Sequence, residues 1–491
     1  MQLFSHTKFH NLSSNIDKLL HIPYNNPVLL MINLQKNPYL VVLLSFLTVI
    51  LIGSFLLTTP LANTSGTWGD FIDSLFMATS ALAVTGLSVF SDVSAQFSLF
   101  GEIVLIVLMI LGGLGIITIF TFFTIIFGRK IGIMDRYLLK EALNLTSMQG
   151  AIKLIISIIR IALIFIFGGT FLLSFAFVPS MGLGEGLYHA FFLSVSSFNN
   201  AGLDILGDSS LIAYANNPIV LTTVMLLIVS GGLGFLVILD LWSIFKAKFF
   251  SKKTGEDAIS DQHRMSTYTQ IVLTMSAILI AFGLVMLLLT ELNVHPDFTW
   301  SDALFTSISS RTAGLTVVSI RDLTNASKYL IIALMFIGAN PISTGGGIKT
   351  TTTFIVVLAI VALLRGKKVH AFKRTFSIES ILKAMALIII SVVFLILMVL
   401  LVEYIEQFNT TYPEGTLTAT SILFEVVSAF GTVGFSEGIT PYLSSTSKVV
   451  ISIIMLLGRI GPIAAISVFT EKLSWSKDST FQYQEVTIPI G

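Results

Sequence analysis

Hydrophobic residues gather into eight long segments along the chain, separated by shorter polar ones. A helix that crosses the hydrocarbon core of a bilayer needs about 20 mostly apolar residues, and each segment meets or approaches that length. They cover residues 39–59, 103–127, 154–178, 219–245, 267–290, 329–364, 384–402 and 449–470. The pattern predicts an all-α integral membrane protein with eight transmembrane helices.

The sixth apolar segment is too long for one span, and a run of glycine, proline and small polar residues at 338–349 interrupts it. Non-helical backbone at membrane depth is tolerated only where it is buried in protein or lines a water-filled cavity. We therefore expect this break to have a function.

Composition narrows the class of protein further. Of the 491 residues, 54% are hydrophobic and only 11% are charged, whereas roughly 25% charge is usual in a soluble domain. A net charge of +1 is too small to drive nucleic-acid binding by counterion release, so lipid is expected as a partner and nucleic acid is not. The chain has no cysteine, which excludes disulfides and thiol nucleophiles.

Basic residues predict the orientation, because Lys and Arg are retained on the cytoplasmic side of a membrane. Of the 28 Lys and Arg residues, 21 lie in the two tails and the even-numbered connections. The odd-numbered connections hold only Arg321, Lys328 and Lys448. Both termini are therefore predicted to be cytoplasmic, with tails at 1–37 and 471–491.

The eight predicted spans fall into four sequence repeats of two spans each. After each odd span comes a semi-apolar stretch too short to span, and then a glycine turn; anchored on glycine, stretches 76–88, 192–204, 304–316 and 424–436 align without a gap. The predicted repeats are 38–127, 151–246, 267–364 and 377–470. Each repeat holds two spans, so all four enter the membrane in the same direction. We expect pseudo-fourfold helix, pore loop, helix units around a central pore.

The four turns have the chemistry of a cation filter. A monovalent cation that sheds its water needs a ring of oxygens, which backbone carbonyls supply without a fixed charge. Glycine adopts the required backbone conformations at little cost. The fourth turn, Thr432-Val433-Gly434-Phe435-Ser436, is close to the Thr-Val-Gly-Tyr-Gly filter of potassium channels. An ordinary helix C-cap would explain one such turn, but not four in register.

Other chemistries find little support in the sequence. The seven histidines show no metal-ligand spacing, and the glycine-rich strings lack the strand-turn-helix context of a nucleotide site. An enzyme is therefore not expected, and no covalently bound cofactor is predicted. A secondary carrier of a small organic solute remains the alternative; it predicts a midplane pocket with paired polar side chains instead of four equivalent turns.

The motifs in combination resemble the Trk/Ktr/HKT superfamily of potassium transporters. They are the four turns, Arg311-Thr-Ala-Gly314, the broken stretch from Ser343 to Thr352 and Gly458-Arg-Ile-Gly-Pro462. With eight spans and no extra N-terminal pair, the chain is most similar to the membrane subunit of bacterial Ktr systems. The resemblance implies potassium uptake across the plasma (inner) membrane by a homodimer, with a cytosolic RCK-type nucleotide-binding subunit as regulator and sodium as a candidate activator.

The resemblance also assigns roles to individual residues. The potassium-binding filter residues are expected to be Val84, Thr85, Gly86, Asn200, Ala201, Gly202, Thr312, Ala313, Gly314, Thr432, Val433 and Gly434, and no other metal site is expected. Residues 339–353 are similar to the family's intramembrane gating loop. Gating is assigned to Gly345, Gly346, Gly347, Lys349 and Arg459.

Arg459 and Asp204 each have a functional and a structural interpretation, and Arg311 has a structural one. Arg459 either hinders passage below the filter or pairs with Asp240 or a cluster of carbonyls. Arg311 is expected to have a scaffold role, paired with a carboxylate such as Glu425. Asp204 either enriches cations at the outer mouth or is a solvated loop carboxylate.

Overall fold

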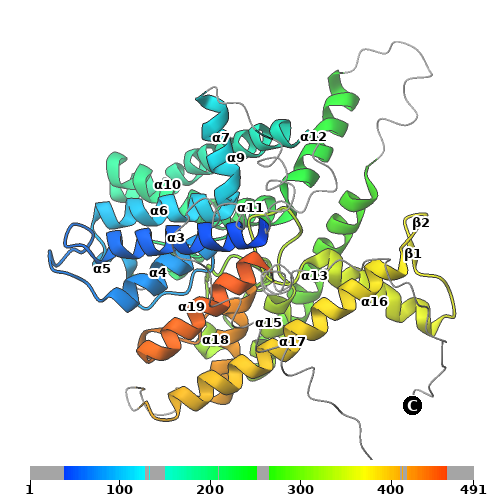
Figure 1. Ribbon diagram of the computed structural model, residues 1–491. Coiled ribbons are helices and arrows are strands. Elements are labelled where there is room, and N and C mark those ends of the chain that lie inside the picture. Colours follow the sequence, from blue (N-terminus) through cyan, green and yellow to red (C-terminus); the bar gives the residue numbers. More distant parts are fainter. Residues whose placement is uncertain are drawn as a thin grey trace, which may run out of the picture.

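The computed structural model describes residues 38–127, 132, 150–207, 210–250, 265–409, 412 and 417–461. The described chain is a bundle of helices with one small β-hairpin (Figure 1). The first half contains α3 (Pro38–Thr58), α4 (Phe71–Ala83), α5 (Val93–Gln96), α6 (Leu99–Leu114), α7 (Ile116–Ile126), α9 (Ala151–Met181), α10 (Leu183–Asn199), α11 (Pro218–Leu233) and α12 (Phe235–Phe250). The predicted tails, 1–37 and 471–491, lie outside the described residues.

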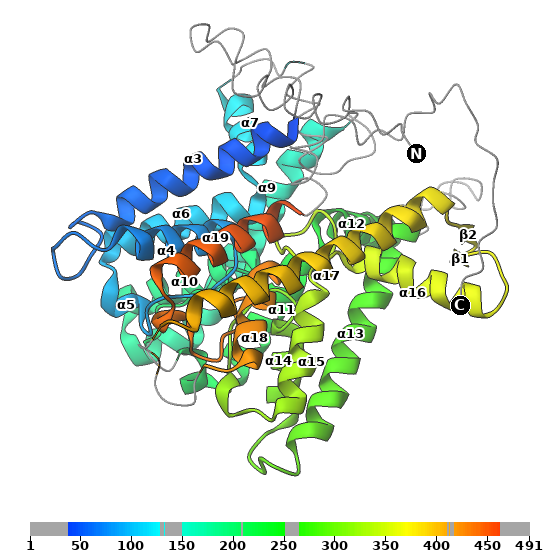
Figure 2. The ribbon, with the colours of Figure 1, turned by 60° about the horizontal axis from the view of Figure 1, so that its bottom comes forward.

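The second half continues the alternation of long and short helices. It contains α13 (Thr267–Glu291), α14 (Trp300–Ser309), α15 (Asn325–Phe336), α16 (Thr350–Leu364), the antiparallel strands β1 (His370–Ala371) and β2 (Arg374–Thr375), α17 (Ile378–Glu406), α18 (Ala419–Gly431) and α19 (Ser445–Ile460). Short 3₁₀ turns lie at Ser210–Tyr214, Ile320–Asp322 and Thr440–Tyr442. Helix α19 packs against α4 in both views, so the last described helix meets the first part of the chain (Figure 2).

Four helices are long and apolar enough to cross a membrane: Leu40–Thr58, Ile152–Met181, Thr267–Glu291 and Ile378–Glu406. They coincide with the first, third, fifth and seventh predicted spans. The sequence therefore predicted these four correctly, because an uninterrupted apolar run of this length determines a spanning helix. Many of their large side chains are exposed, as lipid contact requires; Phe171 and Leu400 are examples.

The second and fourth predicted spans differ from the continuous helices expected. Helices α6 and α7 meet at 95°, and α11 and α12 meet at 101°. The breaks fall at Gly115 and Gly234, whose φ angles are 85° and 91°. Counting each bent pair as one span, the described chain has up to six spans by length and composition. The eighth predicted span is described only as far as Gly461.

The short helices are the buried elements. Phe76 on α4, Phe192 on α10 and Phe424 on α18 are fully buried, and each lies ten residues before a turn glycine. Side-chain caps fix where these helices begin: Asp70 Oδ1 accepts from the N–H of Ile72 at 2.7 Å, and Thr299 and Thr418 form capping boxes. The caps and the buried aromatic side chains set the positions of the turns that follow.

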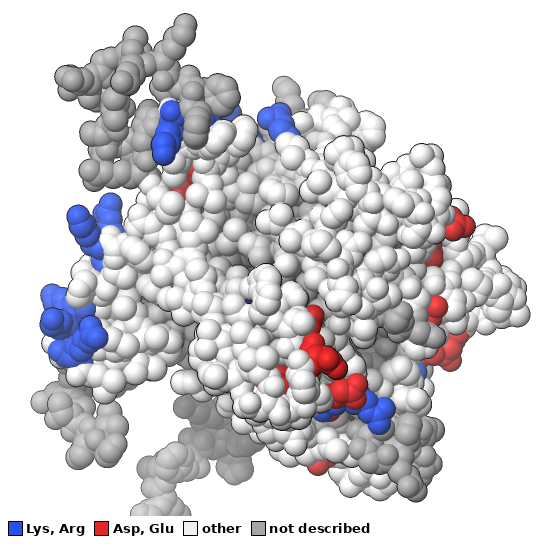
Figure 3. All heavy atoms as spheres, turned by 180° about the vertical axis from the view of Figure 1, so that it is seen from behind, with Lys and Arg blue, Asp and Glu red and all other residues white. Residues whose placement is uncertain are grey.

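Charged side chains are distributed unevenly over the surface. On the face shown in Figure 3 most Lys and Arg lie toward one end and most Asp and Glu toward the other, with a nearly uncharged band between them. The exposed basic residues include Lys367, Lys368, Lys373 and Arg374 around the β-hairpin. A multi-pass membrane protein has such a band, since charged side chains are costly in hydrocarbon.

Candidate functional site

Three of the four turns begin in the same strained conformation. Val84, Asn200 and Thr432, each two residues before a turn glycine, are left-handed, with φ angles of 58°, 57° and 49°. This region is rarely populated by β-branched residues such as Val and Thr. Strain of this kind persists only where the surroundings enforce it, and it gathers at functional sites.

The third turn is built differently. Helix α14 ends at Ser309, and Ser310 has ordinary helical angles. The N–H groups of Thr312 and Ala313 both donate to the carbonyl of Ser309, at 3.2 and 2.9 Å. The four turns therefore align in sequence while one of them reaches its glycine by another route.

The four turn glycines lie beside one another in the order 86, 202, 314, 434. A methyl group placed on Gly86 would lie 2.7 Å from the carbonyl oxygen of Ala201 and 2.8 Å from Cα of Gly202. A methyl group on Gly202 would meet the carbonyl oxygen of Ala313 at 2.6 Å.

The contacts of Gly314 and Gly434 complete a closed ring of four glycines. A methyl group on Gly314 would meet the carbonyl oxygen of Val433, and one on Gly434 would meet the carbonyl oxygen of Thr85 and, at 2.9 Å, Cα of Gly86. All four glycines have φ between 67° and 97°, and a side chain at any of them would require the neighbouring turn to shift. The twelve filter residues predicted from the sequence, residues 84–86, 200–202, 312–314 and 432–434, therefore converge in one place, which we call the glycine ring.

Serine hydroxyls hold two of the turns. Oγ of Ser80 accepts from the N–H of Gly86, and Oγ of Ser428 accepts from the N–H of Gly434, both at 3.1 Å. The equivalent Ser196 has no hydrogen-bond partner for its Oγ among the described residues. The serine pattern in the sequence thus corresponds to a bond that fixes the glycine in the first and fourth turns.

The second glycine cluster of the first, second and fourth repeats has a packing role that sequence reasoning did not assign. Methyl groups on Gly112, Gly231 and Gly458 would collide with the carbonyl oxygens of Leu82, Phe198 and Phe430. Each of these oxygens lies four residues before a turn glycine. Glycine is required because a helix backbone crosses directly against the end of a short helix.

The break between α15 and α16 lies against the glycine ring. Thr344 is fully buried; its Oγ1 lies 2.7 Å from the side-chain amide of Asn200, and its N–H donates to the carbonyl of Gly231 at 3.3 Å. The N–H of Gly346 donates to Oγ1 of Thr432 at 2.9 Å. The loop therefore bonds directly to residues that begin the second and fourth turns.

Asn340 in the same break is a site residue that the sequence analysis missed. Its Nδ2 donates to the carbonyl of Gly232 at 2.8 Å and to Ser276 Oγ at 3.3 Å, and its Oδ1 accepts from Thr350 Oγ1. An asparagine inside an apolar segment was the only available signal. It binds the loop to the break region of the second repeat.

Arg459 binds backbone carbonyls, and it pairs with no acid among the described residues. Its guanidinium donates to the carbonyls of Thr344 and Gly112, and more weakly to that of Gly113 at 3.3 Å. The alternative pairing with Asp240 is wrong, because Asp240 accepts instead from the N–H of Ser266 at 3.0 Å. Arg459 therefore connects the first, third and fourth repeats.

Lys349 stays within its own loop. Its Nζ donates to the carbonyl of Gly345 at 2.8 Å. Gly345 itself packs against the side chains of Thr312 and Ala339. The predicted gating residues Gly345, Gly346, Gly347, Lys349 and Arg459 thus form one contiguous cluster beside the glycine ring.

The expected ion pair of Arg311 with Glu425 is wrong. The carboxylate of Glu425 accepts from Thr440 and, at 2.9 Å, from Ser436. Nε of Arg311 is buried with no hydrogen-bond partner among the described residues. Opposite charges in a sequence do not show that two side chains meet. Here two hydroxyl groups, and not Arg311, donate hydrogen bonds to the carboxylate of Glu425.

Asp204, two residues after Gly202, is a braced loop carboxylate. It accepts from the N–H of Leu206 at 3.1 Å and from the hydroxyl of Ser210. Burial raises the pKa of Asp204 above its usual value. Asp204 is therefore a half-buried, hydrogen-bonded loop carboxylate, and its role at the outer mouth stays a prediction.

Comparison with known proteins places this arrangement in a family. Residues 139–480 match the TrkH family, described as "Cation transport protein". The chain is 35% identical to the "Ktr system potassium uptake protein B" of Vibrio alginolyticus, over 92% of this chain and 94% of that protein. It is 34% identical to the "Potassium/sodium uptake protein NtpJ" of Enterococcus hirae, over 93% and 98%.

A solved structure has a similar fold. The crystal structure of "the Potassium Transporter TrkH from Vibrio parahaemolyticus" matches 92% of this chain and 86% of that one, with a TM-score of 0.63 at 17% identity. These matches confirm the predicted resemblance to the Trk/Ktr group and the expectation of a transporter instead of an enzyme. The chain belongs to the TrkH family of cation transport proteins.

Proposed function

We propose that this protein takes up potassium passively through the glycine ring. The observation that carries the proposal is the closed order of contacts from Gly86 through Gly202 and Gly314 to Gly434 and back. Four turns that meet by backbone alone present carbonyl oxygens from four directions, as a cation that sheds its water requires. Relatives whose names specify potassium uptake support this choice of ion.

The same contacts support a repeat architecture for the proposed pathway. Eight membrane-crossing units in four pseudo-equivalent pairs would place one turn of each pair at a common axis. The second crossing unit is the bent pair α6–α7 in the first repeat and the bent pair α11–α12 in the second. In the third repeat it is α15 and α16 with the loop between them. In this arrangement both termini and the β-hairpin face the cytoplasm, and the positive-inside rule supports that orientation.

The loop from Gly338 to Lys349 is the proposed gate. It bonds to Asn200 and Thr432 of the ring through Thr344 and Gly346, and Arg459 holds it to the break of α6. Passage requires these bonds to open or to shift. The proposal also includes a cytosolic RCK-type subunit as regulator, a homodimer of this chain and sodium as an activator. These follow from the resemblance to Ktr systems.

The alternative, a carrier of small organic solutes, needs a pocket of suitable size. Sites for small molecules usually have volumes of about 300 to 1,000 Å³. The cavity beside the third turn, lined by Ser276, Arg311 and Thr312 among others, has a volume of about 20 Å³. A second cavity, lined by Phe298 and Val318 among others, has a volume of about 200 Å³. Both volumes lie below that range, which favours the ion pathway.

Growth on limiting potassium by a strain that lacks its own uptake systems tests the proposal. Wild type, co-expressed with a cognate ring subunit, is expected to restore growth and potassium flux, and Gly86→Ser is expected to shift the flux toward sodium. Gly168→Ser is the matched control, because Gly168 lies on α9 with no atom within 4 Å of a methyl group placed there.

Either of two results would contradict the proposal. One is the lack of potassium flux in wild type when the protein is present in the membrane. The other is an unchanged ratio of potassium to sodium flux in Gly86→Ser when that variant is folded, since the ring would then not contact the ion.

A further inference from the structure

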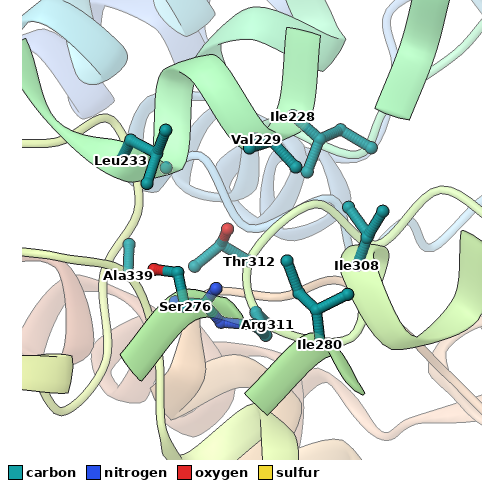
Figure 4. Close-up of a pocket in the computed structure, with 10 residues that line it drawn as sticks. Ile228, Val229, Leu233, Ser276, Ile280, Ile308, Arg311, Thr312 and Ala339 are labelled. Atoms are coloured by element: carbon teal, nitrogen blue, oxygen red, sulfur yellow. The ribbon is translucent and has the colours of Figure 1, made fainter. Parts of the chain in front are cut away.

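A small cavity lies behind the third turn, between the second and third repeats. Residues from α11, α13, α14 and the loop enclose it (Figure 4). Most of the lining is apolar: Ile228, Val229, Leu233, Ile280, Ile308 and Ala339. Its volume of about 20 Å³ exceeds the roughly 10 to 15 Å³ that one water molecule needs.

Arg311 carries a positive charge into this cavity. The residue is only 8% exposed, and its Nε is buried with no hydrogen-bond partner among the described residues. None of the residues that line the cavity is acidic. A buried charge is costly unless it is paired and hydrogen-bonded, so this site is incomplete as protein alone.

The other polar groups in the cavity are donors as well. Ser276 Oγ accepts from Asn340 Nδ2 at 3.3 Å, which leaves its hydroxyl hydrogen free to donate. Thr312, which carries a second hydroxyl, also lines the cavity. In Figure 4 the nitrogens of Arg311 and the hydroxyl of Ser276 lie toward one side, and Ile280 and Ile308 lie on the other.

We propose that this cavity binds one monovalent anion of chloride size, held by the guanidinium of Arg311 and the hydroxyls of Ser276 and Thr312. Two hydroxyls that can donate beside an unpaired, positively charged side chain match an anion, and the volume limits it to a single atom. A lone water would satisfy hydrogen bonds but would leave the charge of Arg311 uncompensated.

The site lies beside the ring, because Thr312 both lines the cavity and precedes Ala313 and Gly314. An anion there would cancel the repulsion that Arg311 otherwise exerts on a cation in the ring. Binding itself does not depend on the proposed potassium pathway, so the two can fail separately.

Bromide in place of chloride gives the direct test, because bromide scatters anomalously. The full chain is crystallised in detergent with sodium bromide as the only halide. We expect an anomalous peak within hydrogen-bond distance of Arg311 and Ser276. Bromide found only on the surface, with water or nothing in the cavity, would overturn the proposal.

A halide titration of thermal unfolding tests the same site in solution. Bromide replaces gluconate at constant ionic strength, and the melting temperature is expected to rise with bromide. A hydrogen bond to a charged group has an energy that corresponds to about a tenfold change in affinity, so Ser276→Ala should need about tenfold more bromide for half the effect.

Ser174→Ala is the matched control, because Ser174 is half-buried on α9, away from the cavity lining, and its hydroxyl bonds to the carbonyl of Phe171. It should titrate like wild type. Arg311→Gln should lose the bromide response. Equal midpoints for Ser276→Ala and wild type would overturn the site even if Arg311→Gln does not fold.

Discussion

The second helices of the first and third repeats break at equivalent places but in different ways. Between α6 and α7 a single residue, Gly115, turns the chain by 95°. Between α15 and α16 the break runs from Ile337 to Lys349, and a bridge between Ile337 and Ile348 closes its base. A one-residue break can only bend a helix, whereas the longer segment reaches the glycine ring.

The two breaks also differ in what holds them. Gly115 would tolerate a methyl group sterically, since the nearest atom, Thr118 Oγ1, lies at 3.5 Å. The longer loop is hydrogen-bonded to three neighbours. Thr344 bonds to Asn200 through its side chain and to Arg459 through its carbonyl, and Gly346 bonds to Thr432. Bonds that cross between repeats make a segment whose position depends on all of them, as a gate requires.

The largest expected effect comes from filling a close crossing. Gly231→Val would drive a side chain into the carbonyl of Phe198, and overpacking against backbone costs about 3 kcal/mol or more. We expect almost no monodisperse protein by size-exclusion chromatography. Gly168→Val on α9 is the control; equal yields for the two variants would contradict the packing role of Gly231.

Release of the long loop should have the next largest effect. Arg459→Gln removes the charge-assisted bonds to Thr344 and Gly112, which are each worth about 1.5 to 3 kcal/mol. Potassium flux in liposomes should rise by roughly tenfold. Arg160→Gln, an exposed arginine on α9, is the control, and an unchanged flux in Arg459→Gln would show that the loop is not a gate.

A smaller gain is expected from the bond between the loop and the fourth turn. Thr432→Ala removes the acceptor for the N–H of Gly346, a neutral hydrogen bond of about 1 kcal/mol. Flux should increase by about fivefold. Thr432→Ser keeps the hydroxyl and should behave like wild type; identical flux in the alanine and serine variants would rule out this contact as a restraint.

The smallest effect is predicted at the one-residue break. Gly115→Ala adds only backbone strain at a φ of 85°, about 1 to 3 kcal/mol, and should lower the melting temperature by a few degrees without changing flux. Gly347→Ala, also at positive φ but 3.2 Å from the carbonyl of Gly431, should change flux. If Gly115→Ala alters flux as strongly as Gly347→Ala, the contrast between the two breaks is wrong.

Local patterns in the sequence were sufficient for some parts of this structure. Apolar length predicted the four long helices, and the glycine register predicted that Gly86, Gly202, Gly314 and Gly434 are equivalent. Both properties belong to short stretches of chain. The contacts among the glycines then follow from packing that places the four turns together.

Other features depend on contacts between distant residues, and the sequence could not predict them. The apolar composition continues through Gly115 and Gly234, so the bends there have no signal in hydropathy. The partners of Arg459 are carbonyls, which every residue carries. For Arg311 a carboxylate partner was the natural expectation, but the structure buries it beside a cavity without one.

The central claim is that an ion passes through the glycine ring, and rubidium tests it most directly. Rubidium replaces potassium in many carbonyl sites and scatters anomalously. We predict that crystals of the full chain grown in rubidium chloride show an anomalous peak among Gly86, Gly202, Gly314 and Gly434. Full rubidium occupancy elsewhere in the bundle, with none at the ring, would contradict the account.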